Sequence, residues 1–339
     1  MTASPFHVMA FTGGATVPAA RFRVRQYGPA LAGQGIVLDE SYPSLGAYPP
    51  RARALRPAWA AASLLQRLPS VLASRSADAV LLQREMLSTL YTLEGLTGRP
   101  RVLDVDDAIH LFRGGRTAER LARACDLVIA GNAWLAEVYG AWNRSVAVLP
   151  TAVDTDALPA APYPAEPVIG WIGTSGNLRY LYAVEDALAA VLERFSRARL
   201  LVCCDGSPAF RRLPEERIDV LPWSPGVEPA FFARIAVGLM PLEDGTWERG
   251  KCSFKMLQYM AAGRPVAVSP VGMNADVLAH GEVGYAARDR GEWVDALSAL
   301  LVDPDRAAGM GRLGREVVEA HYSLRALAPK LAALLRSVA

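Results

Sequence analysis

Short apolar stretches alternate with helix-like stretches along most of this chain, and that alternation limits the possible fold more than any other feature. The apolar stretches predict strands at 8–11, 36–38, 78–82, 101–105, 126–130, 145–149, 168–172, 200–204, 218–221, 237–241 and 266–269. The intervening and following stretches predict helices at 19–31, 57–72, 87–96, 117–124, 133–139, 181–195, 229–234, 254–262, 274–280, 292–301, 306–321 and 324–337. Strands such as Leu201 to Cys204 are continuously apolar, which is typical of parallel sheets covered on both faces. The sequence therefore predicts an α/β protein with parallel sheets.

A Pro/Ala-rich segment at 151–167 interrupts this alternation and has little periodicity of its own. Such a composition is typical of a boundary between domains. The length of 339 residues also fits two domains. We therefore predict a first domain over 1–150, a linker over 151–167, a second domain over 168–322 and a final helix over 323–339.

Composition excludes several classes of protein. Hydrophobic residues make up 52% and charged residues 21% of the chain, as in soluble globular proteins. The net charge of +2 implies no strong attraction to nucleic acid. No signal peptide and no apolar run near the ~20 residues of a membrane span are recognised. The four cysteines lack metal-ligand spacing, so we expect them to be reduced and the protein to be cytoplasmic.

Loops that contain glycine or charged residues follow the predicted strands in both halves of the chain. They comprise Gly13-Gly14, 104–110, 173–179, 204–206 and 243–255. In parallel α/β sheets, ligands bind beyond the carboxyl ends of the strands. The loops therefore predict that both domains contribute to a ligand site, in a cleft between two domains that face each other.

The stretch 248–272 is the most informative of these segments. It predicts a loop, a short helix with Ser253 as its N-cap, a stop at Gly263 and Pro265, and then a strand. Lys251 and Lys255 are two of only three lysines in the chain. A lysine in the first turn of a helix favours binding of an anion.

Four segments together resemble the family-4 retaining glycosyltransferases. Residues 254–272, Phe-Lys-Met-Leu-Gln-Tyr-Met-Ala-Ala-Gly-Arg-Pro-Val-Ala-Val-Ser-Pro-Val-Gly, are similar to the donor-site helix of the family. Residues 150–154, Pro-Thr-Ala-Val-Asp, are similar to its interdomain Pro-Asn-Gly-Val-Asp, and 170–179 to its diphosphate loop. Residues 104–109 lie where many members have a strand that ends in a histidine. The resemblance spans most of the chain and is strongest in the second half.

The resemblance implies the GT-B fold: two Rossmann-like parallel-sheet domains facing across a cleft, with the C-terminal helix crossing back onto the first domain. It implies a retaining transfer of sugar, without metal or other cofactor, from a UDP- or GDP-linked donor to a small-molecule, glycan or lipid-linked acceptor. The expected catalytic residues are Asp106, Asp107 and His110. The expected acceptor-binding residues are Arg21 and Arg25. The expected donor-binding residues are Gly13, Gly14, Gly173, Thr174, Arg179, Gly206, Trp223, Glu248, Lys251, Lys255, Met256, Leu257 and Gln258.

The chain also departs from the family pattern. Many members carry two glutamates separated by seven residues in the donor loop, where this chain has Gly250 and Gln258. Glu248 is a candidate to replace the first glutamate. Asp106 stands at the histidine position, and Thr174 replaces the arginine of the phosphate loop. The stretch 248–272 is therefore predicted as a diphosphate site more firmly than as a site for sugar hydroxyls.

Several alternatives remain open at this stage. Asp104-x-Asp106 could be the metal-binding motif of the other glycosyltransferase fold. A nucleotide-sugar 2-epimerase and a non-catalytic sugar-nucleotide-binding or scaffold partner are two further alternatives. A dinucleotide dehydrogenase is disfavoured, because no Gly-x-Gly-x-x-Gly follows the first strand of either half. Arg51, Arg53 and Arg56 could contact anionic lipid at the inner membrane face, as against a loop in solvent.

Overall fold

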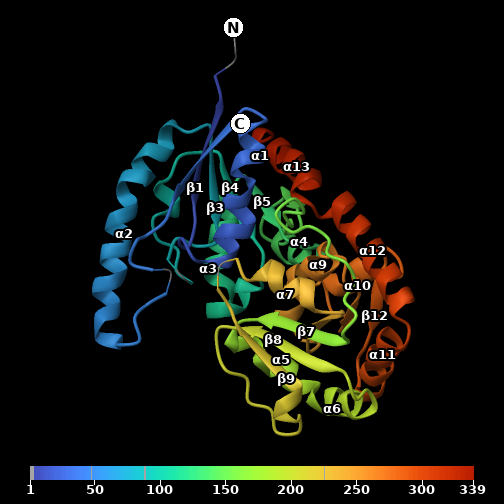
Figure 1. Ribbon diagram of the computed structural model, residues 1–339. Coiled ribbons are helices and arrows are strands. Elements are labelled where there is room, and N and C mark those ends of the chain that lie inside the picture. Colours follow the sequence, from blue (N-terminus) through green and yellow to red (C-terminus); the bar gives the residue numbers. More distant parts are fainter. Residues whose placement is uncertain (1–3, 47, 88, 225) are drawn as a thin grey trace. The chain divides into compact units, whose positions relative to one another are not determined.

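The structure is a computed structural model, and it describes residues 4–46, 48–87, 89–224 and 226–339. The chain divides into two compact units, each with its own parallel sheet (Figure 1). The first unit comprises residues 1–152, 250–252 and 324–339. The second comprises 153–249 and 253–323. The short segment 250–252 is thus separated from the rest of the predicted donor loop.

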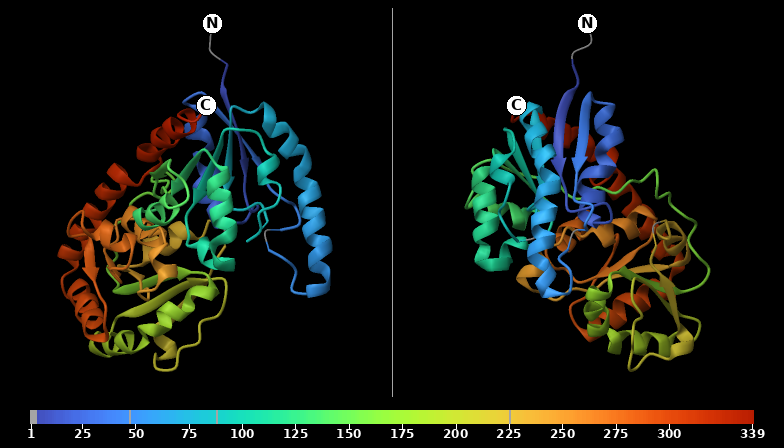
Figure 2. Two further views of the ribbon diagram at one scale, coloured as in Figure 1. Left: turned by 180° about the vertical axis from the view of Figure 1, so that it is seen from behind. Right: turned by 90° about the vertical axis from the view of Figure 1, so that its left-hand side faces the viewer.

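The first unit is built on a six-stranded parallel sheet with the order β2-β1-β3-β4-β5-β6. Its strands are β1 (Phe6–Phe11), β2 (Ile36–Ser41), β3 (Ala79–Gln83), β4 (Arg101–Val105), β5 (Leu127–Ala130) and β6 (Val146–Val148). Its α-helices are α1 (Gly28–Ala32), α2 (Arg56–Ala73), α3 (Arg116–Ala124), α4 (Ala133–Gly140) and α13 (Leu324–Arg336). Alternating apolar residues of these strands form a core with α1 and α13. The views in Figure 2 also place α13 beside α1, so the last helix completes the first unit.

The second unit has a six-stranded sheet with the order β12-β11-β10-β7-β8-β9. Its strands are β7 (Val168–Gly173), β8 (Arg199–Cys204), β9 (Ile218–Pro222), β10 (Val237–Met240), β11 (Val266–Val268) and β12 (Gly284–Ala286). Its helices are α5 (Leu178–Ala183), α6 (Glu185–Arg194), α7 (Glu228–Arg234), α8 (Thr246–Arg249), α9 (Phe254–Ala261), α10 (Met273–Leu278), α11 (Arg290–Val302) and α12 (Pro304–His321). Residues of α5, α6, α11 and α12 form one core with the sheet.

Most predicted elements are present, and the differences have local causes. The predicted helix at 19–31 is broken into a π-helical turn (Ala20–Val24), a 3₁₀ turn (Arg25–Tyr27) and α1. The predicted helix at 181–195 is split into α5 and α6. Two short elements, α8 and β12, were not predicted. Ser253 is the N-cap residue of α9, as predicted, but its side chain makes no capping hydrogen bond and its φ is 50°.

The segment 87–96 was predicted as a helix; residue 88 lies outside the described residues, and residues 87 and 89–96 form a folded loop instead. Glu94 is fully buried, and its carboxylate accepts hydrogen bonds from the backbone N–H groups of Met86 and Thr92. Only a 3₁₀ turn at Glu94–Leu96 remains helical. The loop conformation is favoured because a buried carboxylate needs donors, and these backbone groups supply them.

Within the described part of the chain, no helix combines the length and the apolar character that crossing a membrane requires.

Candidate active site

Both sheets have a point where the strand order reverses, and ligands of such folds bind beside it. In the first unit this point lies between β1 and β3, so it is bounded by the residues that follow Phe11 and Gln83. In the second unit it lies between β7 and β10, beyond Gly173 and Met240. Charged clusters occur at these points in both units.

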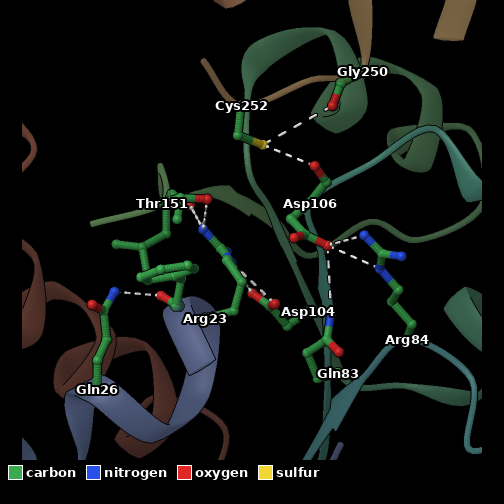
Figure 3. Close-up of polar contacts among 11 residues, drawn as sticks. Arg23, Gln26, Gln83, Arg84, Asp104, Asp106, Thr151, Gly250 and Cys252 are labelled. Carbon is green, nitrogen blue, oxygen red and sulfur yellow. Dashed lines mark hydrogen bonds and ion pairs between the residues drawn. The ribbon is translucent and has the colours of Figure 1, made fainter. Parts of the chain in front are cut away.

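In the first unit, one arginine holds two neighbouring carboxylates. Arg84 follows β3 and donates to Asp106 from Nη2 at 2.6 Å and from Nε at 2.9 Å. The same Nη2 donates to Asp107 at 2.6 Å. Arg84 has a left-handed φ of 64°, an unfavourable conformation for a side chain this large. We call Arg84, Asp106 and Asp107 the first cluster; Figure 3 shows its Arg84–Asp106 pair.

The first cluster has more negative than positive charge. Burial raises the pKa of Asp107, while Arg84 opposes that shift; Asp106 raises it further and Lys251 lowers it. The net effect is a raised pKa, so Asp107 keeps the character of a base. This arrangement can accept a proton or stabilise a nearby positive centre.

Asp104 belongs to a different ion pair. Its carboxylate binds Arg23, whose Nη2 donates to Asp104 at 2.5 Å and whose Nη1 donates to the carbonyl of Leu149 at 2.7 Å. Burial alone would lower the pKa of Arg23, but Asp104 raises it above its ordinary value. Figure 3 shows that Asp104 and Asp106 project toward different arginines. The Asp104-x-Asp106 carboxylates are therefore both engaged with guanidinium groups.

His110 lies in an aromatic surrounding. Its ring centroid is 5.4 Å from that of Trp134, 6.1 Å from that of Tyr139 and 6.3 Å from that of Trp142. Its Nδ1 is buried and has no hydrogen-bond partner among the described residues. Burial lowers the pKa of His110, so the neutral imidazole is favoured near pH 7.

In the second unit, Arg179 is held by a carboxylate and a phenol. Its Nη2 donates to Glu248 at 2.8 Å and to the Tyr180 hydroxyl at 2.6 Å, and its guanidinium lies 4.5 Å from the Tyr180 ring centroid. Tyr180 also donates to Glu248, which is only 4% exposed. We call Arg179, Tyr180 and Glu248 the second cluster. The Arg179 side chain remains 56% exposed.

The loops beside the second cluster require glycine for steric reasons. A Cβ on Gly173 would lie 2.5 Å from the Trp171 ring, and a Cβ on Gly206 would lie 2.8 Å from Cβ of Ser175. Asp205 accepts a hydrogen bond from the backbone N–H of Ser175 at 2.6 Å, which ties the loop after β7 to the loop after β8. These contacts fix the backbone that leads to Arg179.

Comparison with known proteins identifies a domain within the second half of the chain. Residues 166–303 match the family described as "Glycosyl transferases group 1". Over 82 residues, the chain is 39% identical to a GDP-mannose-dependent alpha-(1-6)-phosphatidylinositol monomannoside mannosyltransferase of Mycobacterium tuberculosis. That match covers 24% of this chain and 21% of the relative. Residues 166–303 form a glycosyl transferases group 1 domain.

Two further comparisons extend over more of the chain. A D-inositol 3-phosphate glycosyltransferase of Nocardia farcinica is 27% identical over 203 residues, which cover 52% of this chain and 44% of that protein. The solved structure of Anabaena HepE with UDP and glucose has a TM-score of 0.72 at 14% identity, over 98% of this chain and 100% of that one. The matches thus span less than half the length of these two curated relatives. The structural likeness shows the fold, and the predicted GT-B fold is confirmed.

Within the glycosyl transferases group 1 domain, the predicted donor residues occupy different environments. Thr174 and Trp223 follow β7 and β9, and Trp223 is 39% exposed. Lys255 is half-buried in the first turn of α9. The side chains of Met256 and Leu257 are completely buried, so these residues could contact a donor only through their backbone. Gln258 is also buried, since this helix turns most of its surface into the core.

Lys251 lies within the matched residues 166–303, but the segment 250–252 groups with the first unit. Its carbonyl accepts a hydrogen bond from Asn132, and the Cys252 thiol donates to the carbonyl of Asp106 at 3.1 Å. A Cβ on Gly131 would lie 2.2 Å from the Cys252 sulfur, so glycine is required there. Gly250 likewise has no room for a Cβ beside Ala108. Segment 250–252 therefore contacts the backbone of the first cluster at Asp106, as the Cys252 contact in Figure 3 shows.

The predicted acceptor arginines have separate partners. Arg25 forms a two-bond ion pair with Glu40, at 2.8 Å for each bond, and donates to the carbonyl of Ala15. The Arg21 guanidinium lies 4.6 Å from the centroid of the Phe22 ring. Both arginines are thus engaged with neighbouring groups of the first unit. Gly13 and Gly14 directly follow Thr12, and Gly14 has a φ of 155° that favours glycine.

Sequence reasoning missed Arg84 and Tyr180, which complete the two clusters. The signal for Arg84 was present, because a polar run directly follows the apolar strand β3. A cavity of about 410 Å³ lies beside Tyr180 and was also not predicted. Its polar lining includes Asp186, Glu243, Asp244, Ser269, Arg288 and Arg290.

Proposed function

We propose that this protein is a retaining, metal-independent glycosyltransferase that transfers a sugar from a UDP- or GDP-linked donor. The observation that carries the proposal is the second cluster, which lies at the strand-order reversal of a glycosyl transferases group 1 domain. A mannosyltransferase named as GDP-mannose-dependent and a structure containing UDP are among the similar proteins.

The second unit would stabilise the leaving diphosphate. Negative charge grows on that group as the glycosidic bond breaks, and cations placed beside it lower the barrier. Arg179 supplies an exposed guanidinium, and Lys255 supplies an ammonium at the start of α9. The N-terminus of α9 adds a partial positive charge. Glu248 would hold Arg179 until the diphosphate arrives.

The first cluster would act on the other reaction partner. Burial raises the pKa of Asp107, so it can accept the proton of the acceptor hydroxyl. Asp106, bound to Arg84, would stabilise positive charge near the anomeric carbon. His110 would donate a hydrogen bond as a neutral imidazole.

Metal independence is supported by the partners of the Asp-x-Asp motif. Asp104 and Asp106 are each bound by an arginine, and a divalent cation would have to displace both guanidinium groups. No group of three or more metal-ligating side chains occurs among the residues that the structure describes. Full activity in EDTA would support this part of the proposal, and reactivation by Mg²⁺ or Mn²⁺ would contradict it.

The acceptor side would lie at the inner membrane face of the cytoplasm. Arg51, Arg53 and Arg56 are exposed at the start of α2, and residues 41–77 contain no Asp or Glu. Leu65 and Leu72 on α2 are 64% and 59% exposed. Each basic side chain contributes about 1 kcal/mol near an anionic lipid surface, and the exposed leucines add apolar contact.

Sedimentation with lipid vesicles tests that contact. We expect binding to phosphatidylcholine vesicles that contain phosphatidylglycerol, and little binding to phosphatidylcholine alone. Replacing Arg51, Arg53 and Arg56 by alanine should abolish binding. The matched control replaces Arg116, Arg120 and Arg123, which are exposed on α3 of the same unit. Equal losses in both triple variants would contradict a specific membrane face.

Thermal unfolding with a panel of UDP- and GDP-sugars tests the main proposal. A ligand at 100 times its Kd stabilises the folded state by about 2.7 kcal/mol, so a donor will raise the melting temperature. The selected donor is then incubated with candidate acceptors in EDTA, and the anomeric configuration of the product is determined by NMR. Binding without transfer to any acceptor would favour the non-catalytic alternative, and conversion of the donor without acceptor would favour the epimerase.

A further inference from the structure

Helix α2 contacts its own unit through an unusual set of residues. Its buried residues are Ser63, Arg67 and Val71, which follow one another at intervals of four and share one helical face. Leu65 and Leu72 lie on the outer face instead and are exposed. An arginine is therefore the central residue by which this helix docks, although aliphatic residues are available one or two positions away.

Arg67 reaches the ends of two neighbouring strands. It is only 1% exposed, and its Nη2 donates to the carbonyl of Thr12 at 2.6 Å. Its Nη1 donates to the carbonyl of Ser41 at 3.3 Å. Thr12 follows β1 and Ser41 ends β2, and the N–H of Thr12 donates to the carbonyl of Ser41 at 3.0 Å. The guanidinium thus bridges the last two carbonyls of the β1–β2 ladder.

This arginine has no carboxylate partner among the described residues. Burial lowers the pKa of Arg67 to about 10, partly offset by the charge of Glu94. The Glu94 carboxylate is itself bound by the N–H groups of Met86 and Thr92. The Nε of Arg67 and the hydroxyl of Ser63 are both buried without a partner in the described structure. Burial of an unpaired charge is unfavourable. An arginine at this position therefore implies a role that an aliphatic side chain could not fill.

The position of the two carbonyls defines that role. Gly13 and Gly14 come directly after Thr12, at the point where the strand order of the first sheet reverses. Two adjacent glycines leave this backbone with few side-chain contacts of its own to hold it. We propose that Arg67 is a positioning residue that fixes the start of the Gly13-Gly14 loop by clamping the carbonyls of Thr12 and Ser41.

The second unit supplies a matched control. Arg264 is 0% exposed and donates to two backbone carbonyls, those of Phe232 at 2.9 Å and Pro162 at 3.0 Å. Burial lowers its pKa as well, and its Nη1 has no partner among the described residues. Arg264 precedes β11, at the amino edge of its sheet, away from the carboxyl edge where ligands bind. It therefore reproduces the burial and the carbonyl contacts of Arg67 without the adjoining glycine loop.

Hydrogen–deuterium exchange of the full chain tests the proposal without an assay of activity. We expect Arg67→Met to speed exchange of the amides of Thr12 and Val17 at least tenfold, because both close the loop by backbone bonds to Ser41 and Gly14. Arg67→Lys should give a smaller increase of about threefold, and it remains informative if the methionine variant does not fold. Arg264→Met should leave these amides unchanged. Wild-type exchange in the Arg67 variants, or a uniform increase over the whole first unit, would overturn the proposal.

A kinetic measurement then connects the loop to catalysis, and this part rests on the proposed function. With the nucleotide sugar identified by thermal unfolding, Arg67→Lys should raise KM for the donor about tenfold with kcat changed less than threefold. Arg264→Lys should change neither constant. A fall in kcat at constant KM would overturn the link between Arg67 and donor binding. If the wild-type chain transfers no sugar, the proposed function fails and the exchange measurement still decides the role of Arg67.

Discussion

The two clusters are built from the same kinds of group and differ in their charge balance. In the first cluster, Arg84 is shared by two carboxylates, and Asp107 has a raised pKa. In the second, Arg179 faces the single carboxylate Glu248 and keeps its side chain more than half exposed. The first arrangement retains an available base, and the second retains an accessible cation. Under the proposed function, this difference would assign proton transfer to the first unit and anion binding to the second.

The largest effect is expected from removing the base. Asp107→Asn preserves the shape of the side chain but cannot accept a proton, so kcat should fall about 10²- to 10⁴-fold. In the wild type, the acidic limb of kcat/KM should lie above the ordinary range of an aspartate, because burial raises the pKa of Asp107. Activity is lost as pH falls through that pKa, and this limb should be absent from Asp107→Asn. A limb of unchanged position in the variant would assign the base to another residue.

The next effect concerns stability. Arg84→Met leaves Asp106 and Asp107 without their guanidinium, and loss of one partner from a largely buried pair costs about 3 kcal/mol. Urea unfolding measures the change. The control is Arg123→Met, which removes an exposed pair with Glu119 and should cost at most about 0.5 kcal/mol. Equal changes in the two variants would show that the first cluster has no special energetic role.

Most of the secondary structure could be predicted from sequence, because continuous apolar strands and the glycine and proline residues that end them are local signals. Most strands were placed to within one or two residues, as at 101–105 and 200–204. The loop at 87–96 could not be predicted, because it depends on Glu94 accepting bonds from Met86 and Thr92. The place of 250–252 was also not predictable, since it depends on the absence of a side chain at Gly131.

For the candidate site, the sequence indicated Arg179, Glu248 and the 104–110 loop but not their pairing. The pairing of Arg84 with Asp106 requires the strand order, because the ends of β3 and β4 are then adjacent. The pairing of Tyr180 with Glu248 likewise depends on β7 and β10 being neighbours. The burial of Met256 and Leu257 was missed because a motif was transferred residue by residue without regard to the face of the helix.

A smaller effect is expected on the affinity of the second cluster for nucleotide. Glu248 competes with a bound diphosphate for Arg179, so Glu248→Gln should tighten binding of UDP or GDP about threefold in isothermal titration calorimetry. Lys255→Ala should weaken it about tenfold. Asp106→Asn, the corresponding change in the first cluster, should leave the affinity unchanged. Weaker nucleotide binding by Glu248→Gln would mean that Glu248 orients Arg179 rather than competing for it.

The smallest effect concerns His110. Burial lowers its pKa below that of the unfolded chain, so its contribution to stability is present above the ordinary histidine pKa of about 6.5 and is lost as pH falls through the lowered value. Between pH 7.5 and 5, the wild type should therefore lose slightly more unfolding free energy than His110→Gln. Parallel urea titrations at each pH measure this difference, and identical slopes would indicate that His110 titrates normally.

The division of labour between the clusters is tested most directly by measuring nucleotide affinity and single-turnover rate for Asp107→Asn and Arg179→Ala, with the donor identified by thermal unfolding. The account predicts that Asp107→Asn binds UDP or GDP like the wild type and loses at least 100-fold in rate. It predicts that Arg179→Ala loses at least tenfold in affinity. Loss of nucleotide binding in Asp107→Asn, or wild-type affinity in Arg179→Ala, would contradict it.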